Sequence, residues 1–207
     1  MNSEKSSQAR ICFLGESFVN GTGDPECLGW TGRVCADVNR KGNNITYYNL
    51  GVRGETTTEL KLRYLQELKY RLPQECDGRV VFSFGVNDTF IKNDATRVSL
   101  VNSIIHTREI LKNTKALYPV LMVSPPPVLE LEHNHKIREL SKHFELTCKR
   151  LEIPYLDVFS ILEKSQTWKD EIRGNDGSHP RAGGYTEFSE LVKTWDAWLN
   201  WFPNLTE

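Results

Sequence analysis

The chain has 207 residues, of which 39% are hydrophobic and 26% are charged, and its formal net charge is −1. This length and composition are typical of a single soluble globular domain with one continuous core. The balanced charge gives no electrostatic reason to expect binding to nucleic acid or to an anionic membrane surface. No segment approaches the run of about 20 apolar residues that a membrane-spanning helix needs, so we expect no stable membrane insertion.

The cysteines and the N-terminus bear on the cellular compartment. The number of cysteines is odd and none forms a C-x-x-C pair, which argues against a disulfide framework or a zinc site and favours reduced thiols. Residues 1–9 form a polar leader that lacks the apolar stretch of a signal peptide. We therefore expect a cytoplasmic protein with one domain over residues 10–207.

Short apolar runs, most of them ended by glycine or proline, alternate with segments of helical periodicity. The runs predict buried strands at 11–14, 45–50, 79–84, 120–123 and 155–158. The segments between and after them predict helices at about 31–40, 134–151 and 180–201. They also predict a helix through the leucines of 60–72 and a long helix that includes 98–111. This alternation predicts the α/β class, with a five-stranded parallel sheet and helices on both faces.

The inner faces of two of these helices are expected from their apolar residues. Hydroxyl side chains at Thr56–Thr58 suit the N-cap of the second helix, and Pro73 ends it. Leucines mark the expected inner face of this helix at 60, 62, 65, 68 and 72. Aliphatic residues mark the inner face of the third helix at Val98, Val101, Ile104, Ile105 and Leu111.

Ligands of open parallel sheets bind beyond the carboxyl ends of the strands, where several candidate segments are expected. Gly15-Glu16-Ser17 follows the first strand, and Gly51–Glu55 follows the second. Gly85–Asp88 follows the third strand, and Pro125–Pro127 follow the fourth. Asp176–His179 precedes the last helix. We therefore expect all five segments to meet at one edge of the sheet.

Three residues in these segments suit nucleophilic catalysis. A serine becomes a strong nucleophile when a histidine takes its proton, and a carboxylate fixes the tautomer of that histidine. Asp176 and His179 are three residues apart, so the carboxylate can bond one ring nitrogen and leave the other for Ser17. Pro180 suits the first helical position and would place His179 at a helix start. Gly15-Glu16-Ser17 alone is more often a simple turn, but the combination favours a serine hydrolase.

Stabilisation of an oxyanion needs hydrogen-bond donors, and three are candidates. They are the backbone N–H groups of Ser17 and Gly54 and the side-chain amide of Asn87. Asn87 and Asp88 are equally suited to a simple turn. Gly51 is a rival of Gly54, although both glycines also suit a loop that must avoid strain, and this structural role is favoured for Gly51.

The combination of motifs resembles the SGNH/GDSL hydrolase family. The matching positions are Ser17, Gly54, Gly85-Val86-Asn87-Asp88 and Asp176-Gly177-Ser178-His179. The resemblance spans almost the whole chain and implies a flavodoxin-like three-layer sandwich. It further implies hydrolysis of a small-molecule carboxylic ester or thioester through an acyl-enzyme, without a cofactor or metal. In this likeness the triad is Ser17, Asp176 and His179, and the oxyanion donors are Ser17, Gly54 and Asn87.

One residue departs from the family pattern. The family usually has aspartate directly before the serine, where this chain has Glu16. Glutamate keeps the charge but changes the reach of the carboxylate. We expect this change to tune the activity without abolishing it.

Two alternative functions stay open at this point. A flavodoxin-like module that binds a flavin or nucleotide would draw on Thr22-Gly23 and Thr56–Thr58, but it leaves Asp176 and His179 unexplained. The segment Asn20–Asp24 lacks the Gly-Lys-Ser/Thr ending of a phosphate-binding loop. A catalytically inactive relative of the hydrolases is the other alternative.

Several further residues have two interpretations each. His133 and His135 have H-x-H spacing without a completed zinc shell, so a solvated loop is favoured. Arg53 could bind an acidic substrate group, but a solvated surface arginine is favoured. A packing face is expected at Trp195, Trp198 and Trp201, although exposed ones would suit a subunit interface, which leaves homo-oligomerisation open. Candidates for lining the substrate pocket are Val19, Trp30, Phe90 and Pro125–Pro127.

Overall fold

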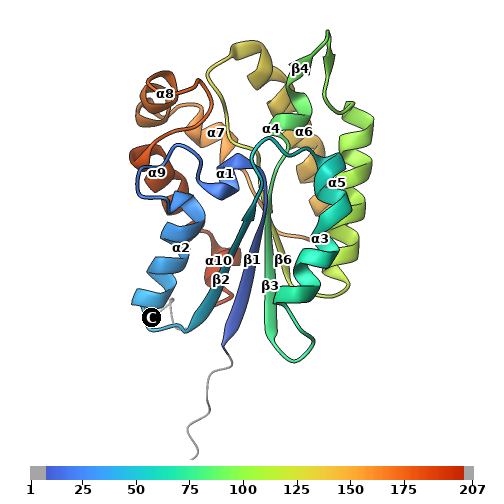
Figure 1. Cartoon of the computed structure of the whole chain (residues 1–207), viewed down its shortest axis with the longest axis vertical. Coiled ribbons are helices and arrows are strands. Elements are labelled where there is room, and N and C mark those ends of the chain that lie inside the picture. The colour runs from blue at the N-terminus through green and yellow to red at the C-terminus, as the bar shows by residue number, and fades with distance from the viewer. Residues whose placement is uncertain (1–7, 203–207) are drawn as a thin grey trace, which may run out of the picture.

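The computed structural model of the chain describes residues 8–202. Residues 1–7, most of the expected leader, and residues 203–207 lie outside the described residues. The first strand begins at Ala9. The three layers of the fold, a twisted sheet between two sets of helices, are visible in Figure 1.

One five-stranded sheet, as predicted, forms the middle layer. Its strands are β1 (Ala9–Gly15), β2 (Ile45–Gly51), β3 (Asp77–Ser83), β6 (Val120–Val123) and β7 (Tyr155–Leu156). They are all parallel and lie in the order β2-β1-β3-β6-β7. This is the flavodoxin-like order. The chain adds β2 on one side of β1 and the later strands on the other side, and this change of direction opens a crevice at the carboxyl ends of β1 and β3. A separate antiparallel hairpin, β4 (Ile91–Lys92) and β5 (Ala95–Thr96), projects above that edge (Figure 1).

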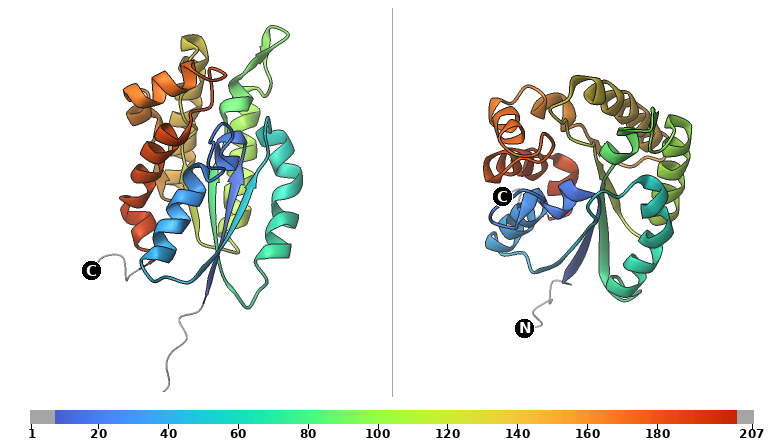
Figure 2. Two further views of the ribbon diagram at one scale, coloured as in Figure 1. Left: turned by 60° about the vertical axis from the view of Figure 1, so that its left-hand side comes forward. Right: turned by 45° about the horizontal axis from the view of Figure 1, so that its top comes forward.

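The helices cover both faces of the sheet, as the two further views show (Figure 2). One face carries α2 (Gly29–Arg40), α7 (Phe159–Leu162), α8 (Gln166–Arg173), α9 (Ala182–Lys193) and α10 (Asp196–Leu199). The other face carries α3 (Thr57–Arg71), α5 (Leu100–Lys115) and α6 (Leu131–Arg150). Two one-turn helices, α1 (Ser17–Asn20) and α4 (Val86–Thr89), follow β1 and β3 at the carboxyl edge.

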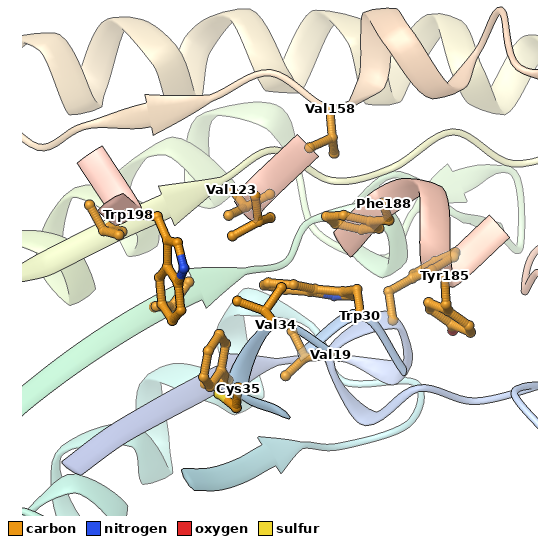
Figure 3. Packing of buried hydrophobic residues seen from close by; sticks show 14 of the residues in the cluster. Val19, Trp30, Val34, Cys35, Val123, Val158, Tyr185, Phe188 and Trp198 are labelled. Carbon is orange, nitrogen blue, oxygen red and sulfur yellow. The ribbon is translucent and has the colours of Figure 1, made fainter. Parts of the chain in front are cut away.

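Two hydrophobic clusters, one on each face, fix the sheet between the helices. Along β1, Ile11 and Phe13 point into one cluster, while Cys12 and Leu14 point into the other. This alternation explains why the strand is an unbroken apolar run, since both of its faces are buried. In the first cluster, drawn in Figure 3, the ring of Trp30 stacks on Phe188 with centroids 4.7 Å apart.

The inner faces of α3 and α5 differ from the predicted ones. In α3 the buried residues are Thr57, Leu60, Tyr64 and Leu68. Leu62 and Leu65 are exposed, so the prediction from the leucine positions was wrong for them. In α5 the buried residues are Ser103, Thr107, Ile110, Leu111 and Thr114. Val101 and Ile105 are exposed because the packed face includes small hydroxyl residues, which a search for aliphatic side chains overlooks.

The C-terminal helix is shorter than predicted and is followed by a break. Thr194 ends α9, Trp195 has an extended backbone, and α10 then begins at Asp196. The change of direction buries Trp198 against Phe13 and Phe202. Trp195 and Trp201 pack, half-buried, against the same cluster, which confirms the interpretation of the tryptophans as a packing face.

Candidate active site

Ser17 is held at the carboxyl edge by a close passage of β1 past β3. A Cβ atom at Gly15 would lie 1.8 Å from the carbonyl oxygen of Ser83, so only glycine lets the chain turn there. The turn places Ser17 as the first residue of α1, with a buried side chain. Its N–H therefore belongs to the first turn of a helix, where no intrahelical acceptor exists.

His179 lies within hydrogen-bond distance of both other residues expected to form a relay. Ser17 Oγ lies 2.7 Å from His179 Nε2, across 162 residues of sequence. His179 Nδ1 lies 2.7 Å from Asp176 Oδ2. A carboxylate only accepts, so Nδ1 carries the proton and Nε2 is left to accept from the serine hydroxyl. This is the tautomer that a general base for Ser17 requires.

Hydrogen bonds to the carboxylate of Asp176 favour its ionised form. Its Oδ1 accepts hydrogen bonds from the N–H groups of Ser178 at 3.0 Å and His179 at 2.8 Å. Burial raises the pKa of Asp176, but these hydrogen bonds and the one from the His179 ring outweigh it and hold the pKa below its usual range. Arg53 Nη2 approaches the same carboxylate to 3.9 Å from the solvent side.

The His179 ring is oriented by packing and not by a helix start. Phe18 lies against it, with ring centroids 4.9 Å apart, and Trp168 stacks on the other side of Phe18 at 6.2 Å. The expectation for Pro180 was wrong, because α9 begins only at Ala182.

The side-chain amide of Asn87 links the segments that carry the other two candidate oxyanion donors. Asn87 Nδ2 donates to Glu16 Oε2, on the residue before Ser17. It also donates to the carbonyl oxygen of Glu55, on the residue after Gly54, at 3.0 Å. The three predicted donor segments are thus brought together around one amide group.

Gly54 suits a donor position better than Gly51. Gly54 has a φ of +78° and no atom lies within 4 Å of the place where a Cβ would stand, so its backbone borders open space. The N–H of Gly51 is already used, because it donates to Asn49 Oδ1 at 3.0 Å. This agrees with the structural role that the sequence favoured for Gly51.

Comparison with known proteins agrees with this geometry. The GDSL-like Lipase/Acylhydrolase family matches residues 13–186, a span that contains every residue of the candidate site. The chain belongs to this family. It is accordingly a hydrolase that acts on ester bonds. No curated protein matches the sequence significantly.

Solved structures of similar fold cover most of this GDSL-like hydrolase. An acetylxylan esterase from Geobacillus stearothermophilus is 16% identical with a TM-score of 0.71, over 92% of this chain and 96% of that one. A lipase/acylhydrolase from Enterococcus faecalis is 22% identical with a TM-score of 0.67, over 90% and 94%. An alpha/beta hydrolase from the metagenome of Lake Arreo, Spain, is 14% identical with a TM-score of 0.69, over 90% and 93%. At such low identities these likenesses concern the fold.

Asp88 of the GDSL-like hydrolase anchors the loop after β3, a role that the sequence did not reveal. Its fully buried carboxylate accepts from the N–H and hydroxyl of Thr57, at 2.7 and 2.5 Å, and from Ser103 Oγ at 2.6 Å. Burial raises the pKa of Asp88, against the effect of these donors. The network ties α3 and α5 to α4, and so fixes the segment that carries Asn87.

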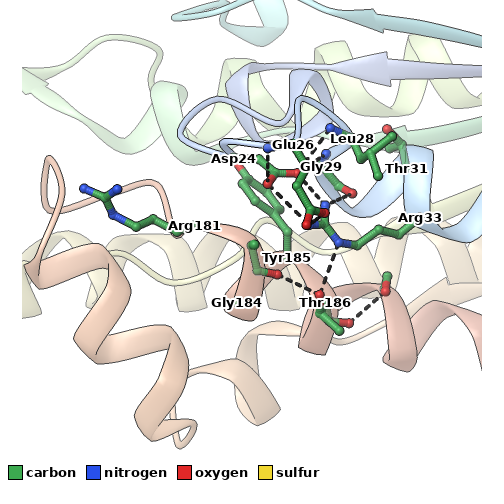
Figure 4. Close-up of polar contacts among 12 residues, drawn as sticks. Asp24, Glu26, Leu28, Gly29, Thr31, Arg33, Arg181, Gly184, Tyr185 and Thr186 are labelled. Atoms are coloured by element: carbon green, nitrogen blue, oxygen red, sulfur yellow. Dashed lines mark hydrogen bonds and ion pairs between the residues drawn. The ribbon is translucent and has the colours of Figure 1, made fainter.

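The loop between α1 and α2 is held by a buried ion pair, drawn in Figure 4. Arg33 Nη1 donates to Asp24 Oδ2, and the N–H groups of Glu26, Leu28 and Gly29 donate to the same carboxylate. Because Asp24 already accepts from these loop N–H groups, they are not free to bind a phosphate. The loop instead lies beside His179, since a Cβ atom added at Gly23 would stand 3.1 Å from the Cβ of that residue.

A cleft of about 500 Å³ opens beside the Asp176 loop. Its apolar walls come from Phe90, Ile91, Val128 and Leu129. Its polar groups are Glu130, His133, Asp176 and Ser178. Of the predicted pocket residues, Phe90 lines this cleft and Pro127 lines a smaller hollow next to it. Val19 and Trp30 are fully buried in the core, so the prediction was wrong for them.

His133 belongs to the first turn of α6 and not to a solvated loop. Its Nε2 lies 3.0 Å from both the carbonyl oxygen of Val86 and Thr89 Oγ1. Among the residues that the structure describes, no group of three His, Cys, Asp or Glu side chains is arranged to hold a metal ion. Within residues 8–202, no helix combines the length and the apolar character needed to cross a membrane.

Proposed function

We propose that the protein cleaves carboxylic esters by way of an acyl-enzyme, with Ser17 as nucleophile, His179 as general base and Asp176 as its orienting carboxylate. The observation that carries this proposal is the continuous pair of 2.7 Å contacts from Ser17 Oγ through His179 to Asp176. Structures of the acetylxylan esterase with serine-to-alanine and with histidine-to-alanine changes are described as catalytic mutants of that enzyme, which agrees with these roles.

The reaction proceeds by two proton relays. As Ser17 Oγ bonds to the ester carbonyl carbon, its proton passes to His179 Nε2, and Asp176 stabilises the imidazolium. The proton then passes to the alcohol oxygen as its bond to carbon breaks, which leaves an acyl-serine. Water attacks the acyl-serine in the same way, and the acid leaves as the proton returns to Ser17.

The negative oxygen of each tetrahedral intermediate needs donors. We assign this role to the N–H groups of Ser17 and Gly54 and to the amide of Asn87. Removing one such donor typically costs about 10²–10³ in kcat. Asn87→Ala is expected to fall in that range, with little change in KM, because the oxyanion exists only after the chemical step has begun.

The proposed triad is tested with a fluorophosphonate probe and a short-chain p-nitrophenyl ester. The wild type should be labelled at Ser17 and should turn the ester over, whereas Ser17→Ala should do neither. Ser160→Ala is the control, because Ser160 is an exposed serine of α7, its hydroxyl donates to Asp157, and it takes no part in the relay. Labelling of Ser17→Ala at the wild-type level would refute the proposal.

The cleft beside Asp176 supports a substrate with an apolar group larger than acetyl. Phe90, Ile91 and Leu129 are partly exposed there, and covering them with substrate removes apolar surface from water. Phe90→Ala should lower kcat/KM for a p-nitrophenyl octanoate by about tenfold and leave the acetate nearly unchanged. Leu62→Ala, on the exposed side of α3, is the control and should change neither. An equal loss on both esters would show that Phe90 does not contact the acyl chain.

A further inference from the structure

Glu16 directly precedes the proposed nucleophile, and its carboxylate is buried against the loop that carries Asn87. We infer that Glu16 is a positioning residue, which holds the Asn87 amide in the orientation that an oxyanion donor needs. The inference rests on the proposed function, because it concerns the same reaction. It adds a residue to which the relay itself gives no role.

Three hydrogen-bond donors face the Glu16 carboxylate. Its Oε1 accepts from the N–H of Val86 at 3.0 Å, and its Oε2 accepts from the N–H of Asn87 at 3.1 Å. The side-chain Nδ2 of Asn87 is the third donor. An ionised carboxylate can accept all three hydrogen bonds. A protonated carboxyl also carries an O–H donor, and that proton would face the three other donors instead of an acceptor. The ionised form is therefore the one that matches this environment.

These contacts fix which end of the Asn87 amide points inward. The inward atom lies within hydrogen-bond distance of two acceptors, Glu16 Oε2 and the carbonyl oxygen of Glu55. The amide oxygen of Asn87 carries no proton and could not donate to these two acceptors. The inward atom is therefore the amide nitrogen. One proton of the Asn87 amide is donated to Glu16. The other proton, which is donated to the carbonyl oxygen of Glu55, is the one that an oxyanion can share.

The length of glutamate, in place of the usual aspartate of the family, serves this contact. Glu16 lies at the end of the turn after β1, and its carboxylate reaches the first turn of α4 on the neighbouring strand connection. It spans from the chain before Ser17 to both backbone and side chain of Asn87. Aspartate keeps the negative charge but its side chain is shorter. Glu16→Asp is therefore expected to weaken the contact with the Asn87 amide without abolishing it.

The contact also responds to pH. Burial raises the pKa of Glu16 to about 8, against the lowering effect of the Asn87 and Val86 hydrogen bonds, and Asp88 of α4 adds a smaller repulsion. Other charged or titratable groups around this segment include the Arg63–Glu55 ion pair, whose Arg63 reaches the carbonyl of Gly15, and His133, which lies within hydrogen-bond distance of the carbonyl of Val86. On the other side, His179 contacts the hydroxyl of the neighbouring Ser17. Deprotonation of Glu16 completes its acceptor set, so kcat should rise with pH through about 8.

Two single variants separate positioning from mere structure. Glu16→Gln has almost the same shape but only one acceptor oxygen, so at least one of the three donors faces its NH₂ group. We expect kcat to fall by about tenfold or more with KM nearly unchanged, and the rise of kcat near pH 8 to disappear. Glu16→Asp should recover part of kcat and keep a pH-dependent rise. Wild-type kcat, KM and pH profile in Glu16→Gln would overturn the inference.

A double-mutant cycle with Asn87→Ala shows whether Glu16 acts through the amide. If it does, Glu16→Gln should lower kcat in the wild type but add almost nothing in the Asn87→Ala background. Independent, multiplicative losses would overturn the inference. If Glu16→Gln does not fold, the cycle is run with Glu16→Asp and judged by the same two outcomes.

The same samples distinguish this inference from the proposed function. Each variant is first treated with the fluorophosphonate probe, because labelling at Ser17 reports an intact relay. A wild type that is not labelled at Ser17 refutes the proposed function. A labelled wild type with multiplicative losses refutes only the role of Glu16.

Discussion

The carboxyl group of Glu16 links the stability of the protein to pH. Its pKa is raised from 4.5 to about 8 by burial, so between these values the folded protein binds a proton that the unfolded chain has released. A raised pKa of an acid therefore stabilises the fold at low pH, and this contribution is lost as the pH rises toward 8. A tenfold difference in proton affinity between the folded and unfolded chains corresponds to about 1.4 kcal/mol.

We expect the free energy of unfolding of the wild type to fall by more than about 1 kcal/mol from pH 6 to pH 9, relative to Glu16→Gln. Glutamine does not titrate, so the pH dependence of the unfolding free energy of the variant comes from all the other groups. The variant therefore serves as the reference. Urea unfolding at a series of pH values measures the difference. Parallel curves for the two proteins would show that Glu16 titrates alike in the folded and unfolded chains.

The contact between Asp176 and His179 could be predicted from sequence, whereas the partner of Glu16 could not. Asp176 and His179 are three residues apart, so one loop brings them together whatever the rest of the chain does. The Glu16–Asn87 contact joins side chains 71 residues apart. It depends on which strands are neighbours and on the tilt of α4, and neither leaves a local pattern. A glutamate in place of the usual aspartate was the one available signal.

At the scale of elements, the loop between α1 and α2 depends on one buried pair. Asp24 is fully buried and Arg33 nearly so, while the outer partner Glu26 is exposed. Removing one partner of a buried pair leaves a charge without compensation, which typically costs about 3–5 kcal/mol. An exposed pair contributes about 0–1 kcal/mol.

Arg33→Leu is therefore expected to lower the free energy of unfolding by about 3 kcal/mol or more. Glu26→Gln, which removes only the exposed partner of the same arginine, should cost less than about 1 kcal/mol. Urea unfolding of the three proteins measures both. Similar costs for the two variants would contradict the view that the buried contact dominates. Because Gly23 of this loop lies beside His179, Arg33→Leu should also lower kcat.

The existence of the long elements followed from the sequence, but the orientation of two helices did not. The N-cap of α3 was predicted within Thr56–Thr58, where the signal is local, and it is Thr56. The inner face of α5 was misassigned because Ser103 is buried to bond Asp88, while Ile105 faces solvent. A polar residue required by a buried network overrides the periodicity of aliphatic ones. The one-turn helices α1 and α4 are too short to have a periodicity at all.

For the molecule as a whole, the site and the C-terminal packing lie at opposite ends of the sheet. The carboxyl ends of β1 and β3 carry Ser17 and Asn87, whereas α10 lies toward the amino ends (Figure 1). The alternation of strands and helices predicted a parallel sheet, and the resemblance to the family supplied its flavodoxin-like order. The break before α10 was not predictable, because it is the burial of Trp198 against a distant strand that turns the chain.

Trp198 tests whether this packing stabilises the fold independently of the site. Its ring is buried against Phe13 and Phe202, with centroids 6.1 and 5.0 Å away. Truncation leaves a cavity in the core, so Trp198→Ala should lower the free energy of unfolding by about 3–5 kcal/mol. Trp195→Ala is the matched control; its ring is only half-buried, so the loss should be clearly smaller. Below the unfolding transition, both variants should keep the wild-type kcat on the p-nitrophenyl ester. A large loss of kcat in folded Trp198→Ala, measured with urea unfolding on the same preparation, would mean that the two ends of the sheet are coupled.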